Sequence, residues 1–466
     1  GGIDELGPAV TTTDNNSYSH NYGVESYLAR INYGFKSRYY IDASWRTDGS
    51  SRFHPSDRWG HFWSVGASWR ISEEQFMENT RQWLDNLTLK VSYGVQGNDN
   101  LGTYYAWQGL YDYTWPNATD AGAFVDKLEN RKVTWEKNGN LNAGIEATMF
   151  GGRLGVSVEY YNRKTRDMLL NSPLPISTGF TGFNDNVGSL RNQGLEVSLR
   201  GTILDKRDFR WDATLMGSFN RNKVLSLTGG QDVITSGIRV IEVGRPIYTF
   251  YLPKTAGVDP ATGKQLYYAY WTQTVNDEGT LVNTRCDEYI TDNVAMATLS
   301  KYYHESREPK LFGSIGSTFT ILKNIDVSFL TTYSIGGWVY DGLYNGSMYV
   351  QYAGNNWHKN AKRRWQKPGD KTDVPMLEVG GSYATTSNSL IDASYFAIKN
   401  ITVGYTLPKR WLKKIDIESL RIYATLDNIA MFNHMDGMDP QYNFTGSVAY
   451  SYTPSRVIAF GIDLNF

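Results

Sequence analysis

The last eleven residues alternate in polarity up to a carboxy-terminal aromatic residue, and this pattern restricts the possible folds more than any other feature of the chain. One face of the run carries Ile458, Phe460, Ile462, Leu464 and Phe466, and the residues between them are mostly small or polar. A period of two residues predicts a β-strand. One face suits lipid and the other suits water, as in the last strand of an outer-membrane β-barrel. A soluble protein can also end on such a strand, so the rest of the chain has to decide.

The composition favours a barrel that crosses a membrane with strands. Aromatic residues make up 14% of the 466 residues, and Tyr alone contributes 33. No apolar run approaches the roughly 20 residues that a membrane helix needs. Membrane strands need only about 10 residues with every second one apolar, and aromatic side chains gather where they cross the interfaces. Because the sequence contains no linker and no shift in composition, we expect one continuous architecture.

Charge and reactive residues exclude several classes of function. The 46 basic and 47 acidic residues nearly cancel, so no nucleic-acid partner is expected. The single Cys286 cannot form an intrachain disulfide or a zinc site of several thiolates. The six His show no metal-ligand spacing, and neither a nucleophile elbow nor a phosphate-binding glycine loop occurs. We therefore expect no catalytic residues, no cofactor and no metal.

Alternating segments recur along the whole chain and predict about thirteen antiparallel strands. The predicted fold class is all-β, a transmembrane up-and-down barrel of which these strands form one part. The strands are expected at 25–34, 38–47, 60–70, 86–96, 138–149, 152–164, 190–201, 209–222, 310–321, 324–338, 393–407, 418–429 and 456–466.

The connections between these strands are sorted by length. Short ones lie at 36–37, 71–85, 151, 202–208, 323–324 and 408–418, whereas the long ones are 97–137, 165–189, 223–309, 339–392 and 430–455. Short turns at one rim and long loops at the other are typical of outer-membrane barrels, in which the short side is periplasmic. Segment 71–85 has helical character, and a phase slip predicts a β-bulge around Lys399 and Asn400.

Five segments, taken together and in order, resemble the SusC-like (SusC/RagA) family of TonB-dependent transporters from Bacteroidetes outer membranes. They are YYNRKTRDMLL (160–170), NQGLEVSLRG (192–201), AGVDPATGKQLYY (256–268), SYFAIKNITVGYTLPKRWL (394–412) and RIYATLDNIAMFNHMDGMDPQ (421–441). The resemblance covers the carboxy-terminal half of a barrel of about 22 strands. It implies that residues 1–466 are one part of a single barrel domain, whose plug and first strands have no counterpart here. The opening GGIDELGPAV is not a signal peptide, and we therefore expect a piece of a longer polypeptide.

The resemblance also implies a function. The expected activity is import of a glycan oligosaccharide or an oligopeptide across the bacterial outer membrane, driven by TonB and assisted by a SusD-like lipoprotein lid on the long surface loops. The partners would be that lid, TonB, the remainder of the barrel and plug, membrane lipid and the cargo. Two alternatives stay open, a passive porin or adhesin barrel and a soluble β-propeller glycosidase. The second predicts a repeat of about 40 to 50 residues, which the sequence does not show.

One loop is dense in flat amphipathic rings, which suit stacking on sugars or gripping peptide side chains. Its aromatic residues are the candidate cargo contacts: Tyr104, Tyr105, Trp107, Tyr111, Tyr113 and Trp115. A loop that packs on itself or against the lid is an equally good interpretation. A second aromatic set stands beside a basic run, which we expect to be solvated: Tyr344, Tyr349, Tyr352 and Trp357 beside Lys362, Arg363 and Arg364. Segment 256–264 (AGVDPATGK) is expected to be a plain turn rather than a calcium loop.

Overall fold

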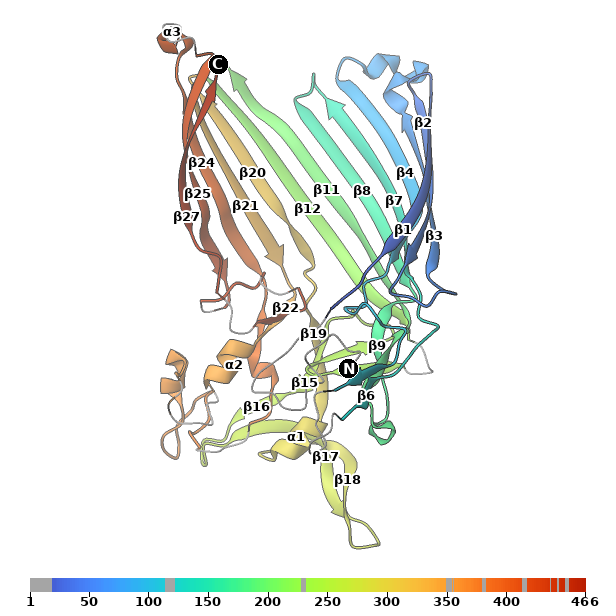
Figure 1. Cartoon of the computed structure of the whole chain (residues 1–466). Coiled ribbons are helices and arrows are strands. Elements are labelled where there is room, and N and C mark those ends of the chain that lie inside the picture. The colour runs from blue at the N-terminus through green and yellow to red at the C-terminus, as the bar shows by residue number, and fades with distance from the viewer. Residues whose placement is uncertain are drawn as a thin grey trace.

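One antiparallel sheet of 13 strands dominates the computed structural model, which describes residues 19–113, 122–227, 232–348, 354, 356–378, 383–412, 417–435, 437–441, 444–448 and 452–466. Each strand pairs with the next one along the chain, and together they form an arc (Figure 1). The strands are Val24–Phe35 (β1), Tyr39–Ser50 (β2), Trp59–Arg70 (β3), Leu84–Asn98 (β4), Glu136–Met149 (β7), Leu154–Arg166 (β8), Ser189–Lys206 (β11), Phe209–Ser226 (β12), Leu311–Ile321 (β20), Ile325–Ile335 (β21), Tyr395–Thr406 (β24), Ser419–Asn433 (β25) and Val457–Asn465 (β27). All thirteen predicted strands are confirmed, with β11 and β12 longer than expected.

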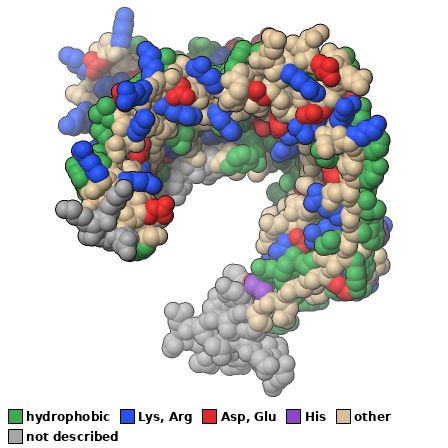
Figure 2. Space-filling view, turned by 90° about the horizontal axis from the view of Figure 1, so that it is seen from above, with side chains coloured by type: hydrophobic (Ala, Val, Ile, Leu, Met, Phe, Trp, Pro, Cys, Tyr) green, Lys and Arg blue, Asp and Glu red, His purple; other side chains and the backbone are tan. Residues whose placement is uncertain are grey.

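The register of the sheet separates an apolar face from a polar one. Consecutive cross-strand partners make one apolar row over six strands: Trp211, Phe319, Val327, Val403, Ala424 and Phe460. A neighbouring row on the opposite face is polar: Thr202, Asp212, Thr318, Ser328, Thr402 and Thr425. Seen from above, the wall curves around a hollow that is open on one side, and hydrophobic side chains gather along its outer surface at the right of the view (Figure 2). The two-residue alternation of the sequence therefore produces a wall with a dry and a wet side.

One end of the sheet carries only short connections (Figure 1, top). Lys36 and Ser37 both have positive φ, 51° and 55°, as a primed hairpin turn requires. The predicted helical connection is confirmed as two 3₁₀ turns, Ile71–Glu73 (η1) and Gln75–Thr80 (η2), and Lys409–Leu412 (α3) forms another cap. The predicted bulge is confirmed as well, because the β24–β25 register shifts between Ile398 and Asn400.

The long connections meet at the other end and build a layer of small sheets, which we call the loop layer. These strands were not predicted. They are Leu110–Asp112 (β5), Phe124–Lys127 (β6), Leu169–Pro173 (β9), Gly182–Asn186 (β10), Val233–Ser236 (β13), Arg239–Glu242 (β14), Thr249–Pro253 (β15), Thr255–Val258 (β16), Gln265–Val275 (β17), Leu281–Thr291 (β18), Lys301–Ser306 (β19), Trp338–Asp341 (β22), Leu390–Asp392 (β23) and Ser447–Val448 (β26). Helical turns join them: Ile176–Thr178 (η3), Val294–Leu299 (α1), Gly342–Met348 (α2), Lys359–Arg363 (η4) and Ser387–Ser389 (η5). The β17–β18 hairpin extends furthest from the wall (Figure 1).

The buried core lies mainly in the loop layer rather than in the wall. The largest fully buried side chains are Tyr267, Phe53, Phe250, Leu252 and Val133, none of which belongs to the 13 strands. In contrast, apolar wall residues such as Ile31 and Phe460 are 72% and 82% exposed. Water is a poor solvent for such a continuous apolar surface, whereas lipid is a good one. Among the described residues no helix combines the length and apolar character needed to cross a membrane.

Candidate functional site

The concave face of the wall is a polar surface with room for a solute. A cavity of about 790 Å³ lies against β2, β3, β4 and β7, and its polar lining includes Asp42, Ser44, Arg46, Asp48, Ser64 and Asn140. The side chains bond to one another across strands, as in the 2.7 Å contact between the Ser44 and Ser64 hydroxyls. Arg46 Nε donates to Asp48 Oδ2 at 2.6 Å. This wall can exchange hydrogen bonds with water or a polar cargo.

Amide side chains connect the concave face to the loop layer. The Tyr161 hydroxyl donates to Asn220 Oδ1 at 2.7 Å, and Asn222 Nδ2 donates to Asn192 Oδ1 at the same distance. Asn222 Oδ1 accepts from the backbone nitrogen of Ile247 at 2.9 Å. Since Ile247 belongs to the long connection after β12, this amide ties that connection to the rim of the wall.

The first half of the predicted aromatic loop holds neighbouring chain in place. The Tyr105 hydroxyl accepts from the backbone nitrogen of Asn21 at 2.8 Å. The guanidinium of Arg52 lies 5.0 Å from the Tyr104 ring and 4.6 Å from the Tyr22 ring. Trp107 meets His54 edge to face, with ring centroids 5.1 Å apart. These contacts favour the packing interpretation for Tyr104, Tyr105 and Trp107.

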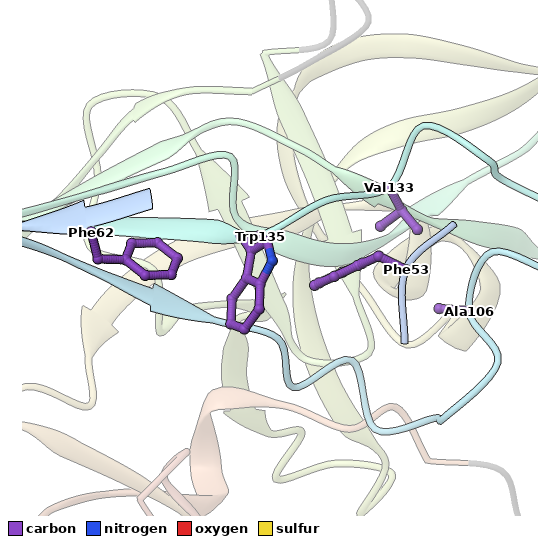
Figure 3. Close-up of a cluster of buried hydrophobic side chains, with 5 residues drawn as sticks. All are labelled: Phe53, Phe62, Ala106, Val133 and Trp135. Carbon is purple, nitrogen blue, oxygen red and sulfur yellow. The ribbon is translucent and has the colours of Figure 1, made fainter. Parts of the chain in front are cut away.

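A buried cluster fixes this loop to the wall (Figure 3). Its members are Phe53, Phe62, Ala106, Val133 and Trp135, and Trp107 packs against them. Trp135 Nε1 donates to the backbone oxygen of Arg58 at 2.7 Å. A Cβ at Gly97 would lie 2.1 Å from the Phe62 ring, so the missing side chain makes room for that ring. The cluster gives the loop a structural task independent of cargo.

In the second half of the aromatic loop, two of the described rings are exposed. Tyr111 in β5 is 57% exposed and Tyr113, just after β5, is 41% exposed. Trp115 lies outside the described residues. Cargo contact by the six aromatic residues therefore stays a prediction, and Tyr111 and Tyr113 are the described ones whose rings are most exposed.

The second aromatic set is partly engaged in packing. Tyr344 in α2 meets the His358 ring edge to face at 4.9 Å, and Trp357 packs against the buried Met348, Ala361 and Val374. Tyr349 and Tyr352 lie outside the described residues. The basic run Lys362, Arg363 and Arg364 is at or just after η4, where Lys362 and Arg363 are exposed. Arg363 is paired with Asp373 at 3.2 Å, which fits the expectation of a solvated surface.

The Asp-Pro segment has the contacts of a turn. Asp259 accepts from the backbone nitrogen of Ala261 at 2.9 Å and from the Thr262 hydroxyl at 2.6 Å. These hydrogen bonds hold the pKa of the Asp259 carboxyl below its usual value. Trp365 Nε1 donates to the oxygen of Pro260 at 2.9 Å and docks the turn on the neighbouring loop. Within the described residues no three His, Cys, Asp or Glu side chains group in a way that would hold a metal ion.

The sequence interpretation missed a set of cation–π contacts between basic side chains and tyrosine rings in the long connection after β12. Arg245 lies 3.7 Å from the centre of the Tyr303 ring, Lys254 lies 4.3 Å from Tyr268, and Arg285 lies 5.1 Å from Tyr270. Burial raises the pKa of the Tyr270 hydroxyl to about 12. The alternation in QLYYAYWTQTV, now β17, was the signal that could have revealed it.

Comparison with known proteins agrees with this geometry. Residues 1–429 match the family described as TonB dependent receptor-like, beta-barrel. The chain belongs to this family. It is 29% identical over 476 residues to TonB-dependent receptor P26 of Formosa agariphila, covering 95% of this chain and 46% of that protein. It is 28% identical over 466 residues to TonB-dependent receptor SusC of Bacteroides thetaiotaomicron, covering 97% of this chain and 44% of that protein.

A solved structure of the RagAB peptide transporter shows the same architecture as this TonB-dependent receptor barrel. The TM-score is 0.82 at 29% identity, with 98% of this chain and 49% of that chain covered. The chain thus spans less than half the length of each of these relatives. The expected resemblance to SusC-like barrels, of the outer-membrane class, is confirmed, and the proteins it matches are named as receptors and transporters.

Proposed function

We propose that this chain is the carboxy-terminal part of the barrel of a TonB-dependent importer. The importer would carry a nutrient, an oligosaccharide or an oligopeptide, across the bacterial outer membrane together with a SusD-like surface lipoprotein. The observation that carries the proposal is the single wall of 13 strands, apolar on its outer face and polar on its concave face. The match to SusC and to the RagAB peptide transporter supports the transport class.

The two edges of the wall support a larger closed barrel. β1 pairs only with β2 and β27 only with β25, so each has one edge without a partner strand in the described sheet. Each unpaired backbone group in hydrocarbon costs several kcal/mol. We therefore assign residues 1–466 to one part of a single barrel domain, which strands outside this chain complete. The short-turn end would face the periplasm and the loop layer the cell surface.

Import in this proposal needs no bond to be made or broken by the chain. The polar concave wall keeps the route wet, and the rings of Tyr111 and Tyr113 are exposed where cargo would arrive. TonB would supply the energy through a plug outside this chain. The lipoprotein lid would sit on the loop layer, where the smaller sheets offer a folded surface.

The test is uptake by cells that carry the full-length gene. Growth on an oligosaccharide or an oligopeptide as sole nutrient should require both this gene and tonB, and deleting the gene of the proposed SusD-like lipoprotein should reduce it. Growth that persists without tonB would favour the passive porin. A full-length product that is water-soluble, with its apolar face covered by a second protein layer, would reject the barrel altogether.

A further inference from the structure

The cavity on the concave face has a floor of small side chains. Ser44 of β2 pairs with Ser64 of β3, which pairs in turn with Gly94 of β4. In the next row along the strands, Gly66 of β3 pairs with Ser92 of β4. All five residues line the cavity. Because neighbouring strands are about 4.8 Å apart and same-face residues about 6.8 Å apart, the floor measures roughly 10 Å by 7 Å.

The two glycines of the floor make room for their neighbours. A Cβ at Gly66 would lie 2.5 Å from Asp42 Oδ1, and a Cβ at Gly94 would lie 2.7 Å from Ser64 Cβ. The Asp42 carboxylate therefore lies over the backbone of Gly66, inside the cavity that both residues line. A larger residue at either glycine would displace the side chains that shape the depression.

Two polar groups at this floor have no partner in the described chain. Asp42 and Ser92 line the cavity, and both are half-buried, so solvent reaches them. Neither forms a hydrogen bond or an ion pair with a described residue. In contrast, Arg46 Nε in the same lining is bonded to Asp48 Oδ2 at 2.6 Å. An accessible carboxylate and an accessible hydroxyl without protein partners can accept hydrogen bonds from a ligand.

The charged groups of the lining favour an uncharged ligand. They are Asp42, Arg46 and Asp48, and the last two pair with each other. An anion would therefore meet the free carboxylate of Asp42 without a free cation that offsets the repulsion. A cation would gain a single water-exposed ion pair, which contributes little, and would leave the hydroxyl of Ser92 unused.

A sugar fits this floor better than a peptide does. The backbone groups of β2, β3 and β4 are used in the pairing between these strands, so the floor offers no free strand edge to an extended peptide. The five floor residues are serine or glycine, which leaves no apolar pocket in the floor for peptide side chains. A sugar ring carries hydroxyl groups that both donate and accept, and these match carboxylate, amide and serine groups.

Aromatic side chains border the cavity at its loop-layer end. Phe62 and Trp135, which belong to the buried cluster under the aromatic loop, are part of its lining. Tyr22, which precedes β1, also lines it and is 49% exposed. The Tyr22 hydroxyl donates to Asp99 Oδ2 at 2.9 Å, which holds the ring in place. A flat amphipathic ring beside hydroxyl-binding groups suits the apolar face of a sugar.

We propose that this cavity is a binding subsite for an uncharged sugar unit of the cargo. Asp42 and Ser92 bind hydroxyl groups of that unit from opposite sides of Gly66. The volume of about 790 Å³ lies within the range of about 300 to 1,000 Å³ that is usual for small-molecule sites. The inference rests on the proposed import function and narrows its cargo to neutral oligosaccharides.

The test is calorimetric binding to the purified full-length protein. The neutral probes are the hexasaccharides of maltose, cellobiose, mannose and xylose type, and the comparison probes are oligogalacturonate, hexaglycine and hexalysine. We expect a neutral sugar to bind more tightly than every comparison probe. The double variant D42A/S92A should weaken that binding about tenfold or more, a change of about 1.4 kcal/mol, because it removes a hydrogen bond to a charged group.

The matched control is T402A/T425A, which removes two hydroxyls 3.0 Å apart on the polar row of the concave face, outside the cavity lining. It should leave sugar affinity within about twofold. S64Q fills the floor and serves if D42A/S92A fails to fold; it should also weaken sugar binding. Binding of none of the sugars, equal or tighter binding of a comparison probe, or an equal loss in T402A/T425A would overturn the site. TonB-dependent growth on an oligopeptide alone would overturn this inference and leave the import proposal standing.

Discussion

At the scale of single residues, Glu308 shows how the loop layer responds to pH. Burial raises the pKa of its carboxyl to about 7 from an ordinary value near 4.5. At a pH between these two pKa values, the carboxyl is protonated in the folded state and ionised in the unfolded state. Its contribution to stability is full below about pH 4.5 and is lost as the pH rises through about 7.

Glu308→Gln should therefore flatten the pH dependence. The free energy of unfolding of the loop layer should rise by on the order of 1 to 3 kcal/mol at pH 8 and stay nearly unchanged at pH 4.5. Thermal unfolding of the full-length protein between pH 4.5 and 8 measures this. Glu305→Gln, a change at an exposed site three residues earlier in the chain, is the control and should leave the profile as it is. A native protein equally stable across that range would contradict the argument.

The exposed tyrosines permit a second test at this scale. Tyr111→Ala with Tyr113→Ala should weaken cargo binding about tenfold, because stacking of one ring on a ligand contributes on the order of 1 kcal/mol. Tyr104→Phe with Tyr105→Phe keeps both rings and removes only their hydroxyls, of which that of Tyr105 bonds to the backbone of Asn21, and should leave affinity unchanged. Cargo affinity measured on the full-length protein distinguishes the two pairs. Equal losses would mean that the loop acts through its fold and not through exposed rings.

At the scale of elements, β27 tests the assignment of the two faces. Phe460 and Ala459 are neighbours with side chains on opposite faces of the strand. Phe460→Arg should destabilise the assembled barrel by about 2 to 4 kcal/mol if this face contacts lipid, whereas Ala459→Arg should change it little. Heat-modifiable migration of the full-length protein from outer membranes reports assembly. Similar defects in both variants would contradict a lipid-facing row.

The wall strands were predictable because lipid on one side and water on the other impose a period of two, as in β27 and β24. The bulge at Lys399 was predictable for the same reason, since an extra residue shifts the phase. Strand β15 escaped because both of its sides are covered by chain, which removes the alternation. Strands β13, β14 and β16 escaped because each has only four residues, too few to show a period. The aromatic loop was only half interpreted, since the partners of Tyr104 and Tyr105 are residues near position 20 and at position 52. No local pattern reveals contacts over such separations.

At the scale of the whole molecule, the unpaired edges of β1 and β27 set what the chain can do alone. Expressed by itself and refolded in detergent, it should remain sensitive to protease and unable to form a heat-modifiable band, because two rows of backbone groups stay unpaired. The full-length protein under the same conditions should be resistant and heat-modifiable. Gel mobility and limited proteolysis measure this difference. A stable, protease-resistant barrel from residues 1–466 alone would contradict the proposed division of the domain.

The burial of Phe53, Phe250 and Tyr267 at one end of the molecule has a consequence for variation among relatives. The loop layer is stabilised by its own hydrophobic contacts, whereas the wall strands depend on hydrogen bonds between strands and on the solvent or lipid around them. Substitutions that change the loop layer therefore need not disturb the wall. Related proteins can therefore differ in cargo while they keep the same wall of strands.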